Sequence, residues 1–298
     1  MSDTHELPIH PVWVKQQSER RSGNQDADFF YDEIAQRLME KLDPIVINVQ
    51  HLVDMGCHEG QRYETLRQKF PQARYTGVDI SSRALEKARK RCRPASLIAR
   101  WLKKTPVTFL EHDMAKTDIA PESVDMIWSN LSLFWHPSPE RVFAEWRRIL
   151  RPEGLCLFTT LGPGNFLQLR QAVADAQLSS RLMPYTDMHD LGDMLVNAGF
   201  SDPVMEQEVI TLQYKKPETL LKDVYALGGN ASKGQSPGLK GRGFYQKLCQ
   251  ALEAQRKPDG YLHLDLEVVY GHAWRANMVQ RGPSEVGISL QSIQKRMF

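Results

Sequence analysis

The chain has 298 residues, of which 41% are hydrophobic and 25% charged, and its formal net charge is +2. This length and composition are typical of a soluble globular protein with one large domain or slightly more. No apolar stretch approaches the roughly 18 residues that a membrane span requires, and the polar, proline-broken N-terminus does not resemble a secretory signal. The four cysteines are far apart, so we expect reduced thiols, no metal site and a cytoplasmic location.

The hydrophobic pattern of the first half predicts strands that alternate with helices. We expect a flexible arm over residues 1–27, then a helix marked by Phe30, Ile34, Leu38 and Leu42. Strands are expected to end at Asp54 and Asp79 and to cover 107–113, 123–130 and 154–161, with helices over 60–70, from Ser81 or Ser82, and over 140–150. Such alternation is typical of a parallel sheet covered by helices on both faces.

After Leu161 the alternation loosens. Helices are predicted over 165–179, 188–198, 217–227 and up to about Arg256, with alternating strands over 205–214 and 263–274. The stretch 228–243 has six glycines and no acid, which is typical of a mobile loop. We therefore predict an α/β fold with a doubly wound, mostly parallel seven-stranded sheet and helical additions at the N-terminus and between the late strands. The expected division is an arm (1–27), a main domain (28–275) with helical insertions at about 162–200 and 215–258, and a tail (276–298).

The segment His51–Gly60, HLVDMGCHEG, carries the strongest functional signal. An apolar run ends in Asp54, glycines follow at Gly56 and Gly60, and the next strand ends in Asp79. This arrangement holds nucleotide-like cofactors, because the glycines let the backbone approach the ligand and the acid accepts hydrogen bonds from ribose hydroxyls. His58 stands where such turns usually have a third glycine, and a positive φ there would cost about 1 kcal/mol. We expect cofactor binding all the same, since the two remaining glycines supply the turn.

The residues around this turn indicate which cofactor is bound. Glu59 lies where a dinucleotide pyrophosphate would approach and would repel it, whereas a cofactor with an ammonium and a sulfonium group fits an acidic entrance. Asp113 and the next backbone N–H could recognise an adenine edge, and Asn130 ends the fourth strand at the same rim of the sheet. We therefore predict S-adenosylmethionine as the cofactor, bound by Asp54, Gly56, Gly60, Asp79, Ile80, Asp113, Met114 and Asn130.

These motifs resemble those of class I S-adenosylmethionine-dependent methyltransferases, which have a Rossmann-like fold. Asp54-Met-Gly56 resembles the glycine motif, Asp79-Ile80-Ser81 the ribose acid, and His112-Asp113-Met114 the adenine contact. The segments 123–163, 187–214 and 267–274 resemble the malonyl-acyl-carrier-protein O-methyltransferases of biotin synthesis. The resemblance runs from about Phe29 to Trp274 and implies methylation of the free carboxylate of a malonyl group on acyl carrier protein, which opens the pimeloyl branch leading to biotin.

A malonyl carboxylate is already ionised at neutral pH, since such acids have pKa values near 4, so it needs no general base. We therefore expect orienting side chains and no catalytic triad, with Tyr31, Trp135 and Tyr185 as candidates. The catalytic residues themselves stay unknown. Because acyl carrier proteins are acidic, the basic residues Lys233, Lys240 and Arg242, or the run Arg89 to Arg93, are candidates for docking this partner.

Two other functions remain open from the residues. One is a hydroxylase or methyltransferase of the complex I assembly type, which shares much of this pattern. The other is a binding or assembly factor that keeps the fold and has lost the cofactor, with His58 as the damaging change. A nucleic-acid methyltransferase is disfavoured, because Ser129-Asn130-Leu131-Ser132 lacks the Asn-Pro-Pro-Tyr or Asp-Pro-Pro-Tyr signature.

Overall fold

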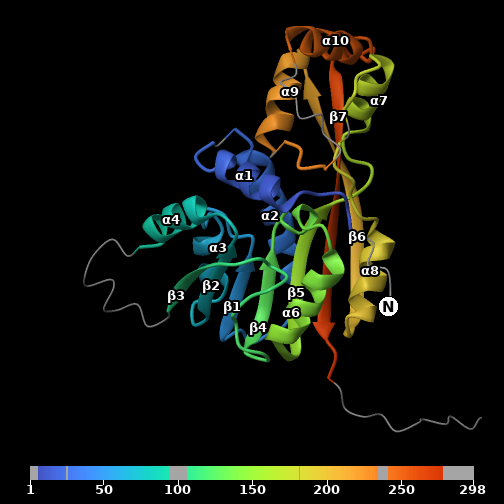
Figure 1. Ribbon diagram of the computed structural model, residues 1–298. Coiled ribbons are helices and arrows are strands. Elements are labelled where there is room, and N and C mark those ends of the chain that lie inside the picture. The colour runs from blue at the N-terminus through green and yellow to red at the C-terminus, as the bar shows by residue number, and fades with distance from the viewer. Residues whose placement is uncertain are drawn as a thin grey trace, which may run out of the picture.

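Within the described residues, seven strands form one sheet in the order β3-β2-β1-β4-β5-β7-β6 (Figure 1). The computed structural model describes residues 6–24, 26–93, 106–180, 182–227, 229–233 and 241–277. Neighbours from β3 to β5 are parallel, and β7 runs antiparallel to both β5 and β6. The strands are β1 His51–Met55, β2 Arg74–Asp79, β3 Val107–Glu111, β4 Val124–Ser129, β5 Leu150–Leu161, β6 Phe200–Tyr214 and β7 Leu262–Arg275. The predicted fold class is confirmed.

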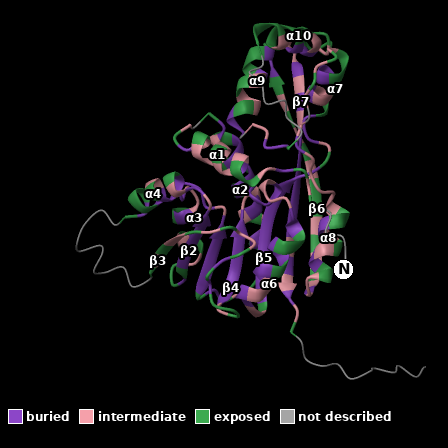
Figure 2. Ribbon diagram, viewed as in Figure 1, coloured by how far each residue is buried: buried purple, intermediate pink, exposed green. Residues whose placement is uncertain are grey.

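Alternate residues of the central strands pack on opposite faces of the sheet. In β1, Leu52 packs in the core cluster that contains Ile34 of α2, whereas Val53 packs in the cluster that contains Phe143 of α6. The central strands are buried on both faces (Figure 2). Helices α2 (Asp28–Leu42) and α3 (Tyr63–Lys69) contribute to the first cluster, and α6 (Pro139–Ile149) and α8 (Met188–Asn197) to the second. This two-sided burial explains why the middle residues of these strands, Leu52-Val53 in β1 and Met126-Ile127-Trp128 in β4, are apolar.

Helix α4 (Ser82–Arg91) follows β2 and begins where the sequence predicted. The Ser81 hydroxyl accepts a hydrogen bond from the Ala84 N–H at 3.1 Å, so Ser81 is the N-cap. A short 3-10 helix, η1 (Leu133–Trp135), follows β4. None of the helices in the described ranges has the length and hydropathy needed to cross a lipid bilayer.

The expectation of a flexible arm over residues 1–27 is wrong for Pro11–Arg21, which forms helix α1 beside α4 (Figure 1). The hydrophobic pattern did not predict this helix, because Val14 is its one buried residue. Backbone hydrogen bonds to distant segments hold the arm instead: the Leu7 N–H donates to the Pro137 carbonyl at 2.7 Å, and the Lys233 N–H donates to the Pro8 carbonyl at 2.7 Å. The boundary of the main domain at residue 28 stays a prediction.

The antiparallel strands β6 and β7 are longer than the other strands and extend past the rest of the sheet (Figure 1). Its far end carries α7 (Leu167–Asp175), α9 (Pro217–Ala226) and α10 (Arg242–Glu253). These helices lie in the predicted insertions 162–200 and 215–258, although α7 ends four residues earlier than the sequence suggested. Residues 234–240 of the glycine-rich stretch, including Lys240, lie outside the described residues, as do 278–298 of the predicted tail.

Candidate active site

A pocket lies at the carboxyl ends of β1, β2 and β4, with α1 and α2 forming its other walls. This is the edge of a doubly wound sheet where ligands are usually bound. The lining includes six of the eight residues that the sequence assigned to the cofactor: Asp54, Gly56, Asp79, Ile80, Met114 and Asn130. Two of the predicted orienting residues, Tyr31 and Trp135, line the same pocket.

Gly56 lets β1 turn tightly beside the loop after β4. Its φ is 75°, and an added Cβ would lie 2.5 Å from the Ser132 Oγ and closer still to the Ser132 Cβ. The N–H groups of Gly56 and Cys57 both donate to the Val78 carbonyl, at 2.8 and 3.0 Å. The turn is therefore fixed between the end of β2 and the β4 loop, which places backbone at the pocket wall.

Two residues predicted to bind the cofactor do not line the pocket. An added Cβ at Gly60 would lie 3.1 Å from Cys92 and 3.3 Å from Ala88, so this glycine permits close packing against α4. Asp113 Oδ1 accepts a hydrogen bond from the Ala115 N–H at 2.8 Å and lies 3.3 Å from His136 Nε2. The hydrogen bond from His136 holds the pKa of Asp113 below its usual value. Asp113 thus faces the next loop, and its neighbours His112 and Met114 line the pocket.

Asp54 and Asp79 place two carboxyl groups at the tips of adjacent strands. Both are buried, at 3% and 7% exposure. Asp54 Oδ2 accepts a hydrogen bond from the Tyr75 hydroxyl at 2.6 Å, and burial raises the pKa of Asp54 to about 7. Asp79 accepts from the backbone N–H groups of His58 and Ser81, both at 2.9 Å, yet burial still raises its pKa. These carboxyl groups favour a ligand that carries positive charge and hydroxyl donors.

His58 adopts the strained backbone that was anticipated, with φ of 46°. Its side chain is 8% exposed, lines the pocket, and lies with Nε2 3.4 Å from the Ser18 carbonyl of α1. Burial lowers the pKa of His58 to about 3, so the imidazole is neutral. A carbonyl partner requires Nε2 to carry the hydrogen, which leaves Nδ1 as an acceptor, and this buried atom has no partner within the described part of the chain.

Glu59 does not have the role that the sequence suggested. Its carboxylate accepts hydrogen bonds from the Ser22 hydroxyl at 2.8 Å and from Lys87 Nζ at 2.9 Å, and Glu59 is not among the lining residues. A paired carboxylate outside the pocket gives no strong repulsion of a pyrophosphate, so that argument against a dinucleotide is wrong. The acidic character of the pocket comes from other aspartates: Asp28, Asp32, Asp54 and Asp79.

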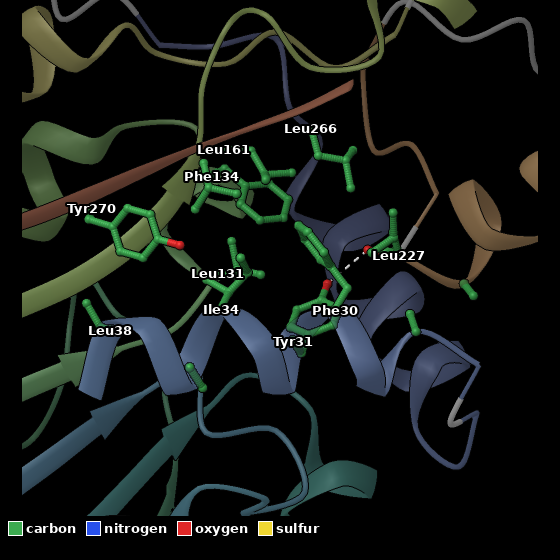
Figure 3. Close-up of a cluster of buried hydrophobic side chains, with 14 of the residues drawn as sticks. Phe30, Tyr31, Ile34, Leu38, Leu131, Phe134, Leu161, Leu227, Leu266 and Tyr270 are labelled. Carbon is green, nitrogen blue, oxygen red and sulfur yellow. Dashed lines mark hydrogen bonds between the residues drawn. The ribbon is translucent and has the colours of Figure 1, made fainter. Parts of the chain in front are cut away.

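A smaller cavity adjoins the first and shares Tyr31, Leu131 and Trp135 with it. Its lining is almost wholly apolar and includes Phe30, Phe134, Leu161, Phe166 and Tyr185. Figure 3 shows part of this cluster, in which the Tyr31 hydroxyl donates to the Leu227 carbonyl at 2.9 Å. Tyr185 belongs to the smaller cavity alone, and burial raises its pKa.

The loop between β4 and η1 forms the wall between the two cavities. Asn130 Nδ2 donates to the Tyr31 carbonyl at 3.0 Å, and Asn130 Oδ1 accepts from the Thr159 hydroxyl at 2.9 Å. Leu131 has φ of 50°, a rare conformation for a residue with a branched side chain, and its N–H donates to Thr159 Oγ1 at 2.9 Å. Asn130 therefore fixes α2 to β5, and the strained Leu131 is held where both cavities meet.

Sequence reasoning missed the contribution of α1 to the pocket. Gln17, Ser18 and Arg21 of this helix line it, together with Val14. The available signal was Pro11 at the first turn, since proline is favoured where a helix begins.

An acidic pocket at the strand ends of a doubly wound sheet is typical of a nucleotide-like cofactor site, and the relatives of the chain identify its class as methyltransferase. The family model described as "Methyltransferase domain" matches residues 53–158. A malonyl-[acyl-carrier protein] O-methyltransferase from Laribacter hongkongensis is 37% identical over 244 residues, which cover 82% of each chain. The enzyme of the same name from Gallionella capsiferriformans is 35% identical over 273 residues, 91% of this chain and 93% of the relative. The chain therefore belongs to the malonyl-[acyl-carrier protein] O-methyltransferase family.

Solved structures with low sequence identity support the fold alone. The YcgJ protein of Bacillus subtilis has a TM-score of 0.56 at 13% identity, covering 82% of this chain and 99% of that one. A phosphoethanolamine N-methyltransferase 2 of Haemonchus contortus, in complex with S-adenosylhomocysteine, has a TM-score of 0.51 at 16% identity. It covers 81% of this chain and 52% of that one.

Proposed function

We propose that this enzyme transfers a methyl group from S-adenosylmethionine to the free carboxylate of a malonyl group carried by acyl carrier protein. The observation that carries this proposal is the pair of adjoining cavities. One is large and acidic, the other is small and apolar, and they share a wall of three residues. The sequence identity to malonyl-[acyl-carrier protein] O-methyltransferases supports the choice of acceptor. A cytoplasmic location stays a prediction.

The residues of the large pocket fit S-adenosylmethionine. Asp79 at the tip of β2 suits the ribose hydroxyls, and Ile80, His112 and Met114 offer a mainly apolar surface for adenine. Asp54 suits the ammonium group at the amino-acid end, and the partnerless Nδ1 of His58 adds a buried acceptor. When bound, this cofactor supplies an electrophilic methyl group on a sulfonium.

The small cavity suits the acyl end of a thioester substrate. Because the malonyl carboxylate is ionised at neutral pH, the chain needs to orient it and exclude water, and no proton transfer is required. The Tyr31 hydroxyl is already bonded to the Leu227 carbonyl, so Tyr31 contributes its ring to the wall. Trp135 and Tyr185 remain as the orienting residues, one on the shared wall and one deeper in the apolar cavity.

The decisive experiment is methyl transfer from labelled S-adenosylmethionine to malonyl-acyl carrier protein. Malonyl-coenzyme A is run alongside, and acetyl-acyl carrier protein is the control because it lacks a free carboxylate. Label on the malonyl carrier alone supports the proposal. Label on neither carrier, from a protein that binds S-adenosylhomocysteine in calorimetry, means that the acceptor is a different molecule. No binding of S-adenosylhomocysteine at millimolar concentration would leave the binding or assembly factor as the better reading.

Replacing Tyr185 by phenylalanine tests the acceptor site. No hydrogen bond joins the Tyr185 hydroxyl to the described residues, whereas the Tyr31 hydroxyl is bonded to Leu227. We expect Tyr185→Phe to keep the melting temperature and the affinity for S-adenosylhomocysteine, and to lower kcat/KM for malonyl-acyl carrier protein about tenfold, since a hydrogen bond to a charged group contributes about 1.5–3 kcal/mol. The comparison variant Tyr31→Phe should lose about 1 kcal/mol of stability. An unchanged kcat/KM in Tyr185→Phe would remove Tyr185 from the acceptor site.

Salt dependence tests docking of the acidic carrier. Lys233 and Arg242 are exposed residues of the glycine-rich stretch, and they are the proposed contacts. In the other candidate segment, Arg89 to Arg93, two arginines already have partners within the chain: Arg89 donates to the Phe109 carbonyl, and Arg91 lies 3.8 Å from Glu59. Raising ionic strength from about 0.05 to 0.3 M should lower kcat/KM for the carrier-bound substrate by roughly threefold or more, because screening weakens steering. For malonyl-pantetheine, a thioester whose pantetheine group carries no charge, kcat/KM should change less than twofold. Equal salt sensitivity of the two substrates would exclude electrostatic docking.

A further inference from the structure

Helix α1 presents one cation to the cofactor pocket. The lining holds two arginines, Arg21 and Arg62, among four aspartates. Arg62 forms an ion pair with Asp32, so its charge is already neutralised. Arg21 makes no ion pair within 4 Å in the part of the chain that the structure describes, and its guanidinium lies over the Tyr31 ring, 3.5 Å from the centroid. Stacking on a ring holds the guanidinium plane while leaving its N–H groups available for an anion.

His58, which stands where a third glycine is usual, and its neighbour Glu59 contact the end of α1 on either side of Arg21. His58 Nε2 lies 3.4 Å from the carbonyl of Ser18, three residues before Arg21. Glu59 accepts a hydrogen bond at 2.8 Å from the hydroxyl of Ser22, the next residue, which is the C-cap of α1 and 4% exposed. Because α1 buries little apolar surface of its own, these contacts contribute much to its placement.

The charges of the cofactor match this arrangement. S-adenosylmethionine carries a sulfonium, an ammonium and one carboxylate. The aspartates at the strand tips suit the two positive groups, but they would repel the carboxylate unless a cation lies beside it. Arg21 is the lining cation that forms no ion pair within 4 Å among the described residues, although its charge acts on Asp28 and Asp79. Its planar fork of N–H groups fits a carboxylate in a bidentate manner.

We propose that Arg21 binds the carboxylate at the amino-acid end of S-adenosylmethionine, and that His58 and Glu59 are positioning residues that hold Arg21 over the pocket. The inference rests on the proposed function only for the identity of the cofactor, not for the methyl acceptor. In this proposal His58 supports cofactor binding, because its imidazole reaches α1, which a glycine at this position could not do.

Binding calorimetry with two ligands tests Arg21. S-adenosylhomocysteine has the amino-acid end, and methylthioadenosine lacks it. Arg21→Met should weaken S-adenosylhomocysteine at least tenfold and change methylthioadenosine less than twofold. The matched control is Arg20→Met, because Arg20 stacks on Tyr225 at 3.8 Å in the same way but does not line the pocket, and it should change neither affinity. Equal weakening of both ligands, or of neither, by Arg21→Met overturns the proposal.

A double-mutant cycle tests the positioning residues. His58→Gly and Glu59→Gln should each weaken S-adenosylhomocysteine by threefold to tenfold, with methylthioadenosine unchanged. In the Arg21→Met background the same substitutions should have no further effect, since they act through Arg21. Additive losses, or equal losses for both ligands, would show a general structural role instead. Failure of wild-type protein to bind S-adenosylhomocysteine would overturn both this inference and the proposed cofactor, whereas failure of methyl transfer with binding intact would affect the proposed acceptor alone.

Discussion

Replacing Asp54 by asparagine is expected to remove most of the affinity for S-adenosylmethionine while leaving the folded chain at least as stable as the wild type at pH 8. Asp54 is 3% exposed, and burial raises its pKa to about 7. Above that pH the ligand-free protein holds a desolvated negative charge, which disfavours the folded state. Asparagine keeps the size of the side chain and an acceptor for the Tyr75 hydroxyl, and it removes the charge. The affinity should fall at least about tenfold, because a hydrogen bond to a charged group contributes about 1.5–3 kcal/mol.

The pH dependence of stability and of binding should have opposite signs. The folded pKa of Asp54 lies above the unfolded value of about 3.9, so its contribution to stability is full at low pH and is lost as pH rises through 7. The melting temperature of ligand-free Asp54→Asn should therefore exceed that of the wild type by more at pH 8 than at pH 5.5. A cationic ligand favours the ionised carboxylate, so wild-type affinity for S-adenosylmethionine should rise from pH 6 to pH 8, by at most about tenfold per pH unit.

Thermal unfolding and calorimetry at several pH values measure both effects. The control is Asp125→Asn, because Asp125 is buried in the same sheet and does not line the pocket. Its carboxylate accepts hydrogen bonds from the N–H groups of Gln50 and His51, both at 2.7 Å, and pairs with Arg151. That variant should lose stability and keep its affinity for S-adenosylhomocysteine. Affinity within threefold of wild type in Asp54→Asn would mean that Asp54 does not contact the ligand.

The parts of the site that could be predicted from the sequence are those where backbone geometry dictates residue type. A parallel sheet brings the ends of its strands to one edge, so residues that end neighbouring strands, such as Asp54, Asp79 and Asn130, had to lie together. Gly56 was predictable because the turn requires a positive φ and a close approach. The fold class was predictable because strands alternate with helices in the first half of the chain, which is typical of a parallel sheet covered on both faces.

The direction of a side chain after a strand end could not be predicted. Asp113 faces His136 and not the pocket, because a histidine 23 residues later in the chain packs against it. Glu59 points away from the pocket because it is hydrogen-bonded to Ser22, the C-cap of α1, and to Lys87 of α4. Long-range backbone hydrogen bonds hold the segment before α1, and contacts from His58 and Glu59 hold its end. Neither leaves a periodic pattern in the sequence, so Arg21 was missed with this helix. Each of these outcomes depends on contacts between segments that are distant in the chain.

Replacing Gly56 by alanine should produce the largest loss of stability among changes in the pocket wall. A φ of 75° costs an alanine about 1 kcal/mol. The new Cβ would also overlap Ser132, whose hydroxyl donates to the Met55 carbonyl at 2.9 Å and lies 2.6 Å from the Ser129 hydroxyl. Because Ser132 is fixed by these bonds, the overlap should cost a further 1–3 kcal/mol or so. The melting temperature should fall by roughly 10 °C, at about 2–4 °C per kcal/mol for a domain of this size.

Two further variants separate the overlap from the backbone strain. Gly260 has a φ of 83°, and an added Cβ there meets nothing within 4 Å, so Gly260→Ala should lose only about 1 kcal/mol and keep its affinity for S-adenosylhomocysteine. Adding Ser132→Gly to Gly56→Ala removes the overlapping atoms and should recover about half of the lost stability, which a double-mutant cycle measures as coupling. Equal losses of stability in Gly56→Ala and Gly260→Ala would show that Ser132 moves at little cost to accommodate the new Cβ. A rigid contact between the turn and the β4 loop predicts a larger loss of stability in Gly56→Ala than in Gly260→Ala. The same contact holds the glycine turn and Leu131 at a fixed separation around the cofactor pocket.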